Sequence, residues 1–274
     1  MEYKRIHLND FFPALKKTDE DAVLEYYLPE KVLIPEHNKR PCVLICPGGG
    51  YTGCSRREAE PIALQFLPES YNVFILTYSV APHRFPQQLL EVAAALELIH
   101  QKADEWGCDS TKVAICGFSA GGHLAAHYST CYDCDAVRAV FPNSKPVQAS
   151  VLGYPVITAD ARYAHMGSFE GLIGHTPESL EEIAFFSCDQ QVSATTPPAF
   201  IWHTSEDEVV PVMNSLLYAA ALTRHNVPVE LHIYPSGWHG LSTLDNQTCG
   251  PLSDPVFRAR RWLDEVKGWL RSTL

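Results

Sequence analysis

The most informative part of this sequence is Lys112-Val-Ala-Ile-Cys116-Gly-Phe-Ser119-Ala-Gly121. An apolar run that ends at Cys116 predicts a strand, and the residues from Ala120 onward predict a helix. The pattern between them is G-x-S-x-G, with Ser119 at its centre. So tight a turn strains the central backbone and leaves no room for side chains at the flanking positions, which glycine satisfies. The stretch therefore predicts a nucleophile elbow at the carboxyl edge of a sheet, with a plain surface turn as the alternative.

On both sides of this elbow, short apolar runs alternate with amphipathic stretches. The runs predicted as strands cover residues 22–28, 41–46, 72–78, 112–116, 150–154, 199–203 and 229–234. The stretches predicted as helices cover residues 57–67, 87–106, 120–128, 212–224 and 255–270. Most of the strand runs are continuously apolar, as in strands covered on both faces. The order predicts an α/β fold, a mostly parallel sheet with helices on both faces, and an antiparallel amino-terminal edge where no helix intervenes.

We expect one domain over residues 1–274, because a chain of this length can bury a single large core. One connection between predicted strands is much longer than the others. About forty residues, 157–196, separate two predicted strands and contain only a short helical stretch at 179–186. Connections of this length in compact domains are usually functional. We interpret the segment as a small cap-like insertion over the site, and a surface excursion without a role is the alternative.

Composition excludes several classes of protein. The chain has 21 Lys and Arg against 32 Asp and Glu, a formal charge of −11, which argues against a nucleic-acid partner. No run of 18 apolar residues predicts a membrane-spanning helix. The amino terminus lacks the apolar stretch of a secretory signal, so we expect a cytoplasmic protein. The oligomeric state stays open, with a homo-oligomer as one candidate.

Nine cysteines are scattered through the chain, several of them inside apolar runs where a thiol acts as a small hydrophobe. Cys131 and Cys134 have the spacing of a redox or zinc motif. No second such pair or paired histidines complete a zinc site, and no strand directly precedes the pair. We interpret the spacing as coincidence and expect no metal.

A serine nucleophile needs a base, and the base needs a carboxylate that fixes its tautomer. In this architecture the acid and then the base follow the serine along the chain. Asp207 follows the strand at 199–203 and is the predicted acid, although Glu206 and Glu208 flank it and remain alternatives. His239, in a loop after the last strand and before a glycine, is the predicted base. The other histidines that we weighed are interpreted as structural: His83, His123, His165, His203, His225 and His232.

Attack on a carbonyl creates an oxyanion that needs fixed donors. The triple glycine at residues 48–50 follows a central strand and lets amides turn toward a substrate. A phosphate-binding loop is excluded because no Gly-Lys-Ser/Thr follows it. We expect the amides of Gly49 or Gly50 to form the oxyanion hole together with the amide of Ala120.

The predicted pocket walls rest on weaker signals. Aromatic residues near the motifs are candidates for the substrate side: Tyr51, Tyr154 and Trp238. Trp202 lies within a strand, where core packing is at least as good an interpretation. The charged run Arg56, Arg57 and Glu58 can either edge the pocket or form a solvated helix start.

Three motifs together resemble the α/β-hydrolase esterases, in particular the small bacterial carboxylesterases labelled acetyl-xylan or feruloyl esterase-like. They are Pro47-Gly-Gly-Gly-Tyr51, Tyr78-Ser-Val-Ala-Pro82 and Gly117-Phe-Ser-Ala-Gly-Gly-His-Leu-Ala125. The similarity runs from about residue 41 onward and implies the α/β-hydrolase fold, with Ser119, Asp207 and His239 as nucleophile, acid and base. Lipase-type loops usually have histidine where this chain has Pro47, so we do not expect long-chain lipase activity.

The expected function is that of a serine esterase that removes short acyl groups, mainly acetyl, from sugars or other small alcohols. The partner is then a small-molecule ester, and no cofactor is needed. Two alternatives remain. One is a peptidase or amidase, because the same triad cleaves amides. The other is a hydrolase fold that has lost catalysis and serves as a small-ligand receptor.

Overall fold

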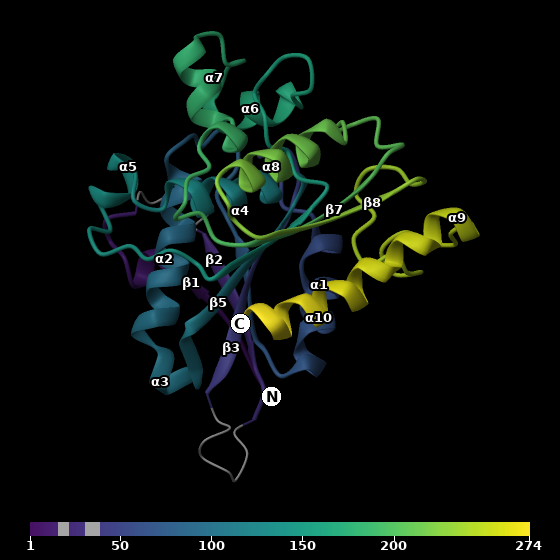
Figure 1. The fold of residues 1–274 in the computed structure, drawn as a ribbon. Coiled ribbons are helices and arrows are strands. Elements are labelled where there is room, and N and C mark those ends of the chain that lie inside the picture. The colour runs from purple at the N-terminus through teal and green to yellow at the C-terminus, as the bar shows by residue number, and fades with distance from the viewer. Residues whose placement is uncertain (16–21, 31–38) are drawn as a thin grey trace.

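A computed structural model describes residues 1–15, 22–30 and 39–274, and its strands form one twisted sheet (Figure 1). The sheet has eight strands among these residues, in the order β1-β2-β4-β3-β5-β6-β7-β8. The strands are β1 (Glu2–His7), β2 (Val23–Leu28), β3 (Arg40–Cys46), β4 (Asn72–Thr77), β5 (Cys108–Phe118), β6 (Ala149–Gly153), β7 (Ala199–Thr204) and β8 (Val229–Tyr234). The pairs β1–β2 and β2–β4 are antiparallel, and all other pairs are parallel. The prediction of a mostly parallel sheet with an antiparallel amino-terminal edge is confirmed.

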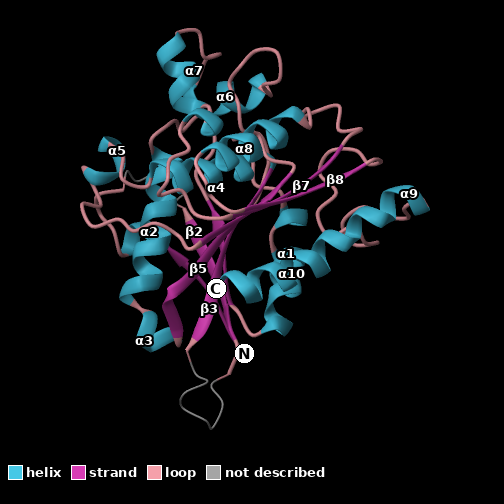
Figure 2. Cartoon of the chain, viewed as in Figure 1, coloured by secondary structure: helices cyan, strands magenta, loops and turns pink. Residues whose placement is uncertain are grey.

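Helices cover both faces of this sheet (Figure 2). The α-helices are α1 (Glu60–Phe66), α2 (Gln87–Gln101), α3 (Ala103–Trp106), α4 (Ser119–Cys131), α5 (Asp135–Arg138), α6 (Met166–Ile173), α7 (Leu180–Phe186), α8 (Met213–Arg224), α9 (Asp254–Phe257) and α10 (Trp262–Thr273). Short 3-10 turns lie at Leu8–Asp10, Arg56–Glu58, Leu67–Glu69, Cys188–Gln190 and Arg258–Arg261. In Figure 1, α2, α4 and α8 lie on one side of the sheet and α1 and α10 on the other.

The two faces of the sheet produce two hydrophobic cores, because alternate residues of a strand point to opposite faces. On β3, Leu44 packs into the core formed with α2, α4 and α8, whereas Val43 and Ile45 pack into the core formed with α1 and α10. All three side chains are fully buried. The central strands are therefore apolar along their whole length, which is the pattern that the sequence displays.

Residues 157–196 carry α6 and α7 and lie at the end of the molecule away from the amino terminus (Figure 1). The predicted short helix at 179–186 is observed as α7, and Ser179 with Glu182 forms a capping box at its start. Helix α6 approaches the triple-glycine loop so closely that a Cβ atom on Gly171 would lie 2.3 Å from the carbonyl oxygen of Gly50. The segment therefore packs directly against the loop that follows β3.

One strand and two of the expected helices differ from the sequence expectations. Strand β1 was not predicted, because its residues are polar and mostly exposed, as on a sheet edge. The single helix expected over 87–106 is divided into α2 and α3 at Lys102. The single helix expected over 255–270 is divided into α9 and α10 by a 3-10 turn at Arg258–Arg261.

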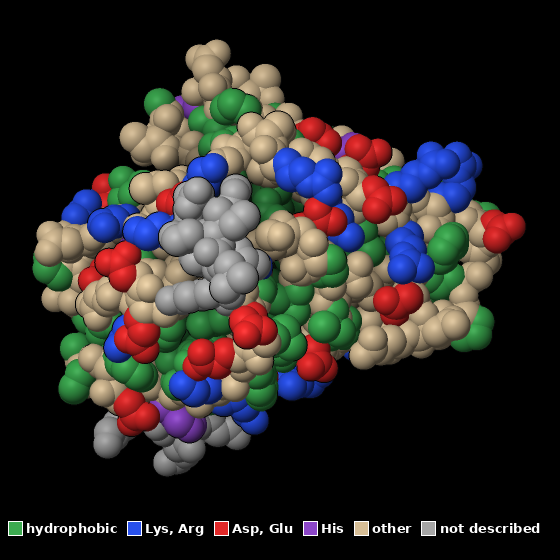
Figure 3. Space-filling model, turned by 90° about the horizontal axis from the view of Figure 1, so that it is seen from below, with side chains coloured by type: hydrophobic (Ala, Val, Ile, Leu, Met, Phe, Trp, Pro, Cys, Tyr) green, Lys and Arg blue, Asp and Glu red, His purple; other side chains and the backbone are tan. Residues whose placement is uncertain are grey.

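Among the described residues, no helix is long and apolar enough to cross a membrane. The face seen from below in Figure 3 carries acidic and basic side chains interspersed with hydrophobic ones.

Candidate active site

The turn from β5 into α4 has the strained geometry expected of a nucleophile elbow. Ser119 adopts a left-handed backbone with φ of 53°, which non-glycine residues rarely do. A Cβ atom on Gly117 would lie 2.2 Å from the carbonyl oxygen of Gly121, and one on Gly121 would lie 2.2 Å from that of Cys46. Both glycines are therefore required by close backbone contacts, and the turn holds Ser119 at the carboxyl end of β5.

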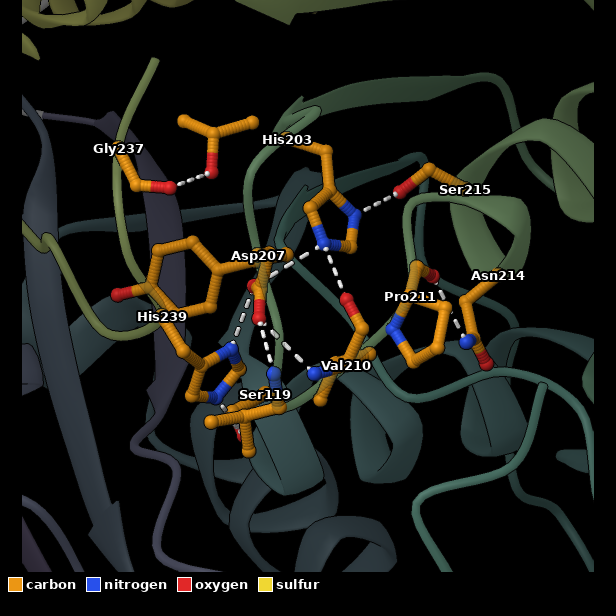
Figure 4. A network of polar contacts seen from close by, with 12 residues as sticks. Ser119, His203, Asp207, Val210, Pro211, Asn214, Ser215, Gly237 and His239 are labelled. Carbon is orange, nitrogen blue, oxygen red and sulfur yellow. Dashed lines mark hydrogen bonds and ion pairs between the residues drawn. The ribbon is translucent and has the colours of Figure 1, made fainter.

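Ser119, His239 and Asp207 form one continuous hydrogen-bonded row (Figure 4). The Oγ atom of Ser119 lies 2.8 Å from Nε2 of His239, and Nδ1 of His239 lies 2.7 Å from Oδ2 of Asp207. Because a carboxylate only accepts, Nδ1 carries the proton and Nε2 of the neutral ring accepts from the serine hydroxyl. The ring therefore has the tautomer that can take a proton from Ser119.

Donors surround the Asp207 carboxylate. Its Oδ1 atom accepts hydrogen bonds from the amides of Val209 and Val210, at 3.0 and 2.9 Å. Its Oδ2 atom accepts from His239 and also faces Nε2 of His203 at 3.2 Å. Burial opposes ionisation of this side chain, but the hydrogen bonds from His203 and His239 outweigh it and lower the pKa of Asp207 well below its usual value. The arrangement keeps the carboxylate charged beside His239.

His203 is a neighbour of this row whose contact with the acid the sequence did not reveal. It is fully buried at the end of β7. Its Nε2 atom lies 3.0 Å from the carbonyl oxygen of Val210, and Nδ1 lies 2.8 Å from the hydroxyl of Ser215. Since the carbonyl only accepts, Nε2 must carry the proton, which it shares with Asp207. The sequence signal for this contact was that His203 lies four residues before the predicted acid, Asp207.

Tyr154 supports His239 from behind and does not line the pocket as predicted. Its ring meets the imidazole edge to face with centroids 5.0 Å apart. Its hydroxyl donates to Oε1 of Glu58 at 2.7 Å and accepts from the amide of Ser242 at 3.0 Å. These two hydrogen bonds hold the Tyr154 side chain in the protein interior behind His239. The ring therefore does not face the substrate side, where the sequence had placed it.

Glu58 connects Tyr154 to the glycine loop through hydrogen bonds. Its Oε2 atom accepts a hydrogen bond from the amide of Gly48 at 2.8 Å. The side chain is buried, not solvated as one sequence interpretation held, and burial raises the pKa of its carboxyl. Arg57 lies beside it on the pocket wall, whereas the exposed Arg56 pairs with Glu25 at 3.0 Å.

The glycine loop presents free amides near Ser119. Gly49 and Gly50 have φ values of 133° and 64°, and within the described part of the chain neither amide donates to a protein acceptor. The carbonyl of Gly49 accepts from the amides of Thr52 and Gly53, which fixes the turn. Ala120 lies in the first turn of α4, where amides have no helical partner. These are the amides that the sequence analysis assigned to an oxyanion hole.

A hollow of about 310 Å³ opens above the row. Its walls are formed by Gly49, Gly50, Ser55, Arg57, Glu58, Ser119, His165, Val209, His239 and Gly240. His165 comes from the segment 157–196, and its Nδ1 atom lies 2.8 Å from the hydroxyl of Ser168. Burial and the neighbouring His239 lower the pKa of His165, so this ring is neutral near pH 7. From the sequence alone His165 is interpreted as structural, and its place in the predicted cap is the signal that it faces the site.

Tyr51 and Trp238 also lie outside the pocket walls. The Tyr51 side chain is buried, and its hydroxyl meets Nδ1 of His123 at 2.8 Å. His123 in turn bonds the carbonyl of Phe186 at 2.9 Å, so this histidine packs behind the elbow as expected. Trp238 precedes His239 and is 48% exposed. The three aromatic residues proposed from the sequence, Tyr51, Tyr154 and Trp238, are thus not wall residues of this hollow.

Other groups of reactive side chains lie outside the pocket. All nine cysteines are free thiols, Cys131 and Cys134 included. Glu230, His232 and Glu265 bring three ligand-type atoms within 4.8 Å of one another. They belong to β8 and α10, and none of them is a wall residue of the hollow at Ser119.

Comparisons with known proteins identify relatives of this chain. The model of the family BD-FAE matches residues 24–222. Endo-1,4-beta-xylanase B of Butyrivibrio fibrisolvens is 39% identical over 219 residues, which cover 76% of this chain and 34% of that protein. Acetylxylan esterase of Xylanibacter ruminicola is 33% identical over 217 residues, which cover 76% of this chain and 42% of that protein. The chain thus matches less than half the length of either relative.

Among solved structures, the acetyl ester-xyloside bifunctional hydrolase of Caldicellulosiruptor lactoaceticus superposes with a TM-score of 0.82. It is 35% identical, and the match covers 98% of this chain and 96% of that one.

Proposed function

This chain belongs to the BD-FAE family and has the α/β-hydrolase fold, and from that premise we propose that it is a serine carboxylesterase. The observation that carries the proposal is the unbroken row of Ser119, His239 and Asp207 beside the free amides of the glycine loop. Such a row activates a serine for attack on a carbonyl carbon.

In the proposed reaction Ser119 attacks the ester carbonyl while His239 takes the hydroxyl proton. The amides of Ala120 and of Gly49 or Gly50 stabilise the oxyanion that forms. His239 then gives its proton to the leaving alcohol, and an acyl-enzyme remains on Ser119. Water attacks that ester with the same histidine as base. Asp207 stays ionised throughout, which agrees with its lowered pKa, and holds the imidazole in the required tautomer.

We propose short acyl groups, mainly acetyl, on sugars or other small alcohols as the substrates. A hollow of about 310 Å³ is at the small end of ligand-binding pockets, which favours short acyl groups over long acyl chains. The Ser55 hydroxyl and the His165 ring in its walls offer hydrogen bonds to a hydroxylated alcohol. The relatives named acetylxylan esterase and acetyl ester-xyloside bifunctional hydrolase support the same class.

We also propose that residues 157–196 act as a partial cap within a single domain. Helix α6 packs on the glycine loop, and His165 from the same segment forms part of the pocket wall. Because every step uses groups of this chain, the proposed reaction needs no metal or cofactor.

Hydrolysis of p-nitrophenyl acetate by the purified protein tests the proposal. Turnover should fall by at least about 10⁴-fold in Ser119→Ala, since no other group can form the acyl-enzyme. Unchanged turnover in that variant would refute the assignment.

A panel of acetyl, butyryl and aminoacyl substrates separates the alternatives. The proposal expects acetyl esters to have the highest kcat/KM. Faster cleavage of aminoacyl amides would indicate a peptidase instead, and no turnover of any substrate would favour a receptor.

A further inference from the structure

Arg57 is a cation on the wall of the Ser119 pocket, and the proposed reaction gives it no task. Its side chain is exposed, and Nη1 donates to the carbonyl oxygen of Thr248 at 3.2 Å. Within the described ranges, no carboxylate oxygen lies at ion-pair distance from its guanidinium, whereas the adjacent Arg56 pairs with Glu25. A guanidinium carries five donors and stays charged at every relevant pH, so most of its hydrogen-bonding capacity remains open here.

The carboxylates near this pocket, Glu58 and Asp207, do not pair with the Arg57 guanidinium. Both oxygens of Glu58 are occupied, one by the amide of Gly48 and one by the hydroxyl of Tyr154. Asp207 is buried behind His239 and accepts four hydrogen bonds. The wall therefore carries one open positive group within a protein whose net charge is −11. An anionic part of a ligand is the group that would complete it.

The position of Arg57 also indicates which half of an ester it meets. A Cβ atom on Gly240 would lie 3.3 Å from Nη2 of Arg57, and Gly240 directly follows His239. In the proposed reaction His239 delivers its proton to the leaving oxygen. The alcohol half of the ester therefore leaves on the side of the pocket where Arg57 lies.

We propose, on the basis of the proposed esterase function, that Arg57 selects esters whose alcohol carries an anionic group. A carboxylate, as in an acylated sugar acid, fits the planar fork of the guanidinium in two parallel hydrogen bonds. A phosphate offers the same chemistry from a different source. Arg57 is then a specificity residue, and it takes no part in bond breaking.

The test uses three aryl acetates that differ only in the meta substituent of the leaving phenol: a carboxylate, a phosphate or a neutral carboxamide. The acetates of 3-hydroxybenzoate, 3-hydroxyphenyl phosphate and 3-hydroxybenzamide serve, with acetate release as the readout. In Arg57→Gln, kcat/KM should fall about tenfold for an anionic ester and stay within twofold for the neutral one. Arg57→Lys should recover part of the loss, more for the phosphate ester than for the carboxylate ester if two parallel bonds matter. The anionic ester that loses more identifies the preferred source.

Arg56→Gln is the matched control, because it removes the same charge from the same turn but not from the pocket wall. It should leave the ratio between anionic and neutral esters unchanged. Raising the salt concentration should weaken the preference of the wild type and leave Arg57→Gln unaffected.

The inference would be overturned if Arg57→Gln left the ratio of kcat/KM between anionic and neutral esters unchanged, either with equal losses on all three esters or with no loss on any. In either case, turnover of the neutral ester by the wild type would leave the proposed esterase function intact. Failure of the wild type on every ester would refute both.

Discussion

The two oxygens of the Asp207 carboxylate have separate tasks. Oδ1 holds the loop through the amides of Val209 and Val210, and Oδ2 faces the rings of His239 and His203. The proposed role in catalysis therefore depends on the second oxygen being an acceptor. An amide nitrogen at that position would favour the wrong tautomer of His239.

We therefore expect Asp207→Asn to lower kcat on p-nitrophenyl acetate by about 10³–10⁴-fold with little change in KM. Steady-state kinetics of the purified variant measure this. Glu208→Gln is the control, because Glu208 is exposed on the same loop and was an alternative acid in the sequence analysis. It should retain activity within twofold. A larger loss in the control than in Asp207→Asn would transfer the role of acid to Glu208.

For individual residues, the sequence predicted those that belong to a motif or have a fixed order along the chain. It missed those whose position depends on packing. Ser119, Asp207 and His239 follow from the elbow and from the order of acid and base along the chain, and the structure brings them together. Tyr154 was misplaced because a tyrosine beside a motif looks the same whether its ring faces a substrate or its hydroxyl bonds a buried partner such as Glu58.

The elbow is the element on which the site depends. Strand β5 and helix α4 meet with backbone atoms so close that Gly117 has no space for a methyl group. The nearest atom is a backbone carbonyl oxygen, which cannot move aside without shifting α4 and with it Ser119.

Gly117→Ala should therefore destabilise the protein by about 3 kcal/mol or more. Urea unfolding followed by circular dichroism measures this free energy. Gly268→Ala is the matched control, since Gly268 is exposed in α10 and no atom of the described residues lies within 4 Å of its added Cβ. That substitution should raise stability by about 0.5–1 kcal/mol through helix propensity alone. Similar effects of the two substitutions would contradict the packing account.

The elements of the core were predictable because burial on both faces leaves a continuous apolar signal, as in β3 and β5. Strand β1 gave no such signal. Its side chains are exposed except that of Ile6, which is partly buried, so the ladder with β2, and not a hydrophobic pattern, defines it. Sequence patterns also do not show that α6 contacts Gly50, because that contact joins segments about 120 residues apart.

Across the whole molecule, buried histidines connect the elbow helix, the glycine loop and residues 157–196. His123 bonds Tyr51 on one side and Phe186 on the other. His127 lies one turn along α4, packed against Phe85 and Phe186, and its Nε2 atom has no hydrogen-bond partner among the residues that the structure describes. Burial lowers the pKa of His123 to about 4 and, with the neighbouring His123, that of His127 to about 3.

These shifts predict that acid weakens the fold. In the unfolded chain a histidine takes up a proton near pH 6.5, whereas His127 in the folded chain does so only near pH 3. Their contribution to stability is therefore complete above about pH 6.5 and is lost progressively as the pH falls toward the folded pKa. Between pH 7 and pH 4.5, the free energy of unfolding of His127→Leu should fall by about 2–3 kcal/mol less than that of the wild type.

Urea unfolding at the two pH values measures the difference. His225→Gln, which alters an exposed histidine, should follow the wild type. If His127→Leu lost as much stability on acidification as the wild type, the burial of His127 would not be the cause.

The most direct test of the central claim is covalent labelling of the intact protein with a fluorophosphonate, followed by mass spectrometry and peptide mapping. We expect one adduct per chain, on Ser119, with labelling abolished in Ser119→Ala and slowed at least about 100-fold in His239→Ala. An adduct at another residue, or labelling of Ser119 at the same rate without the imidazole of His239, would contradict the claim.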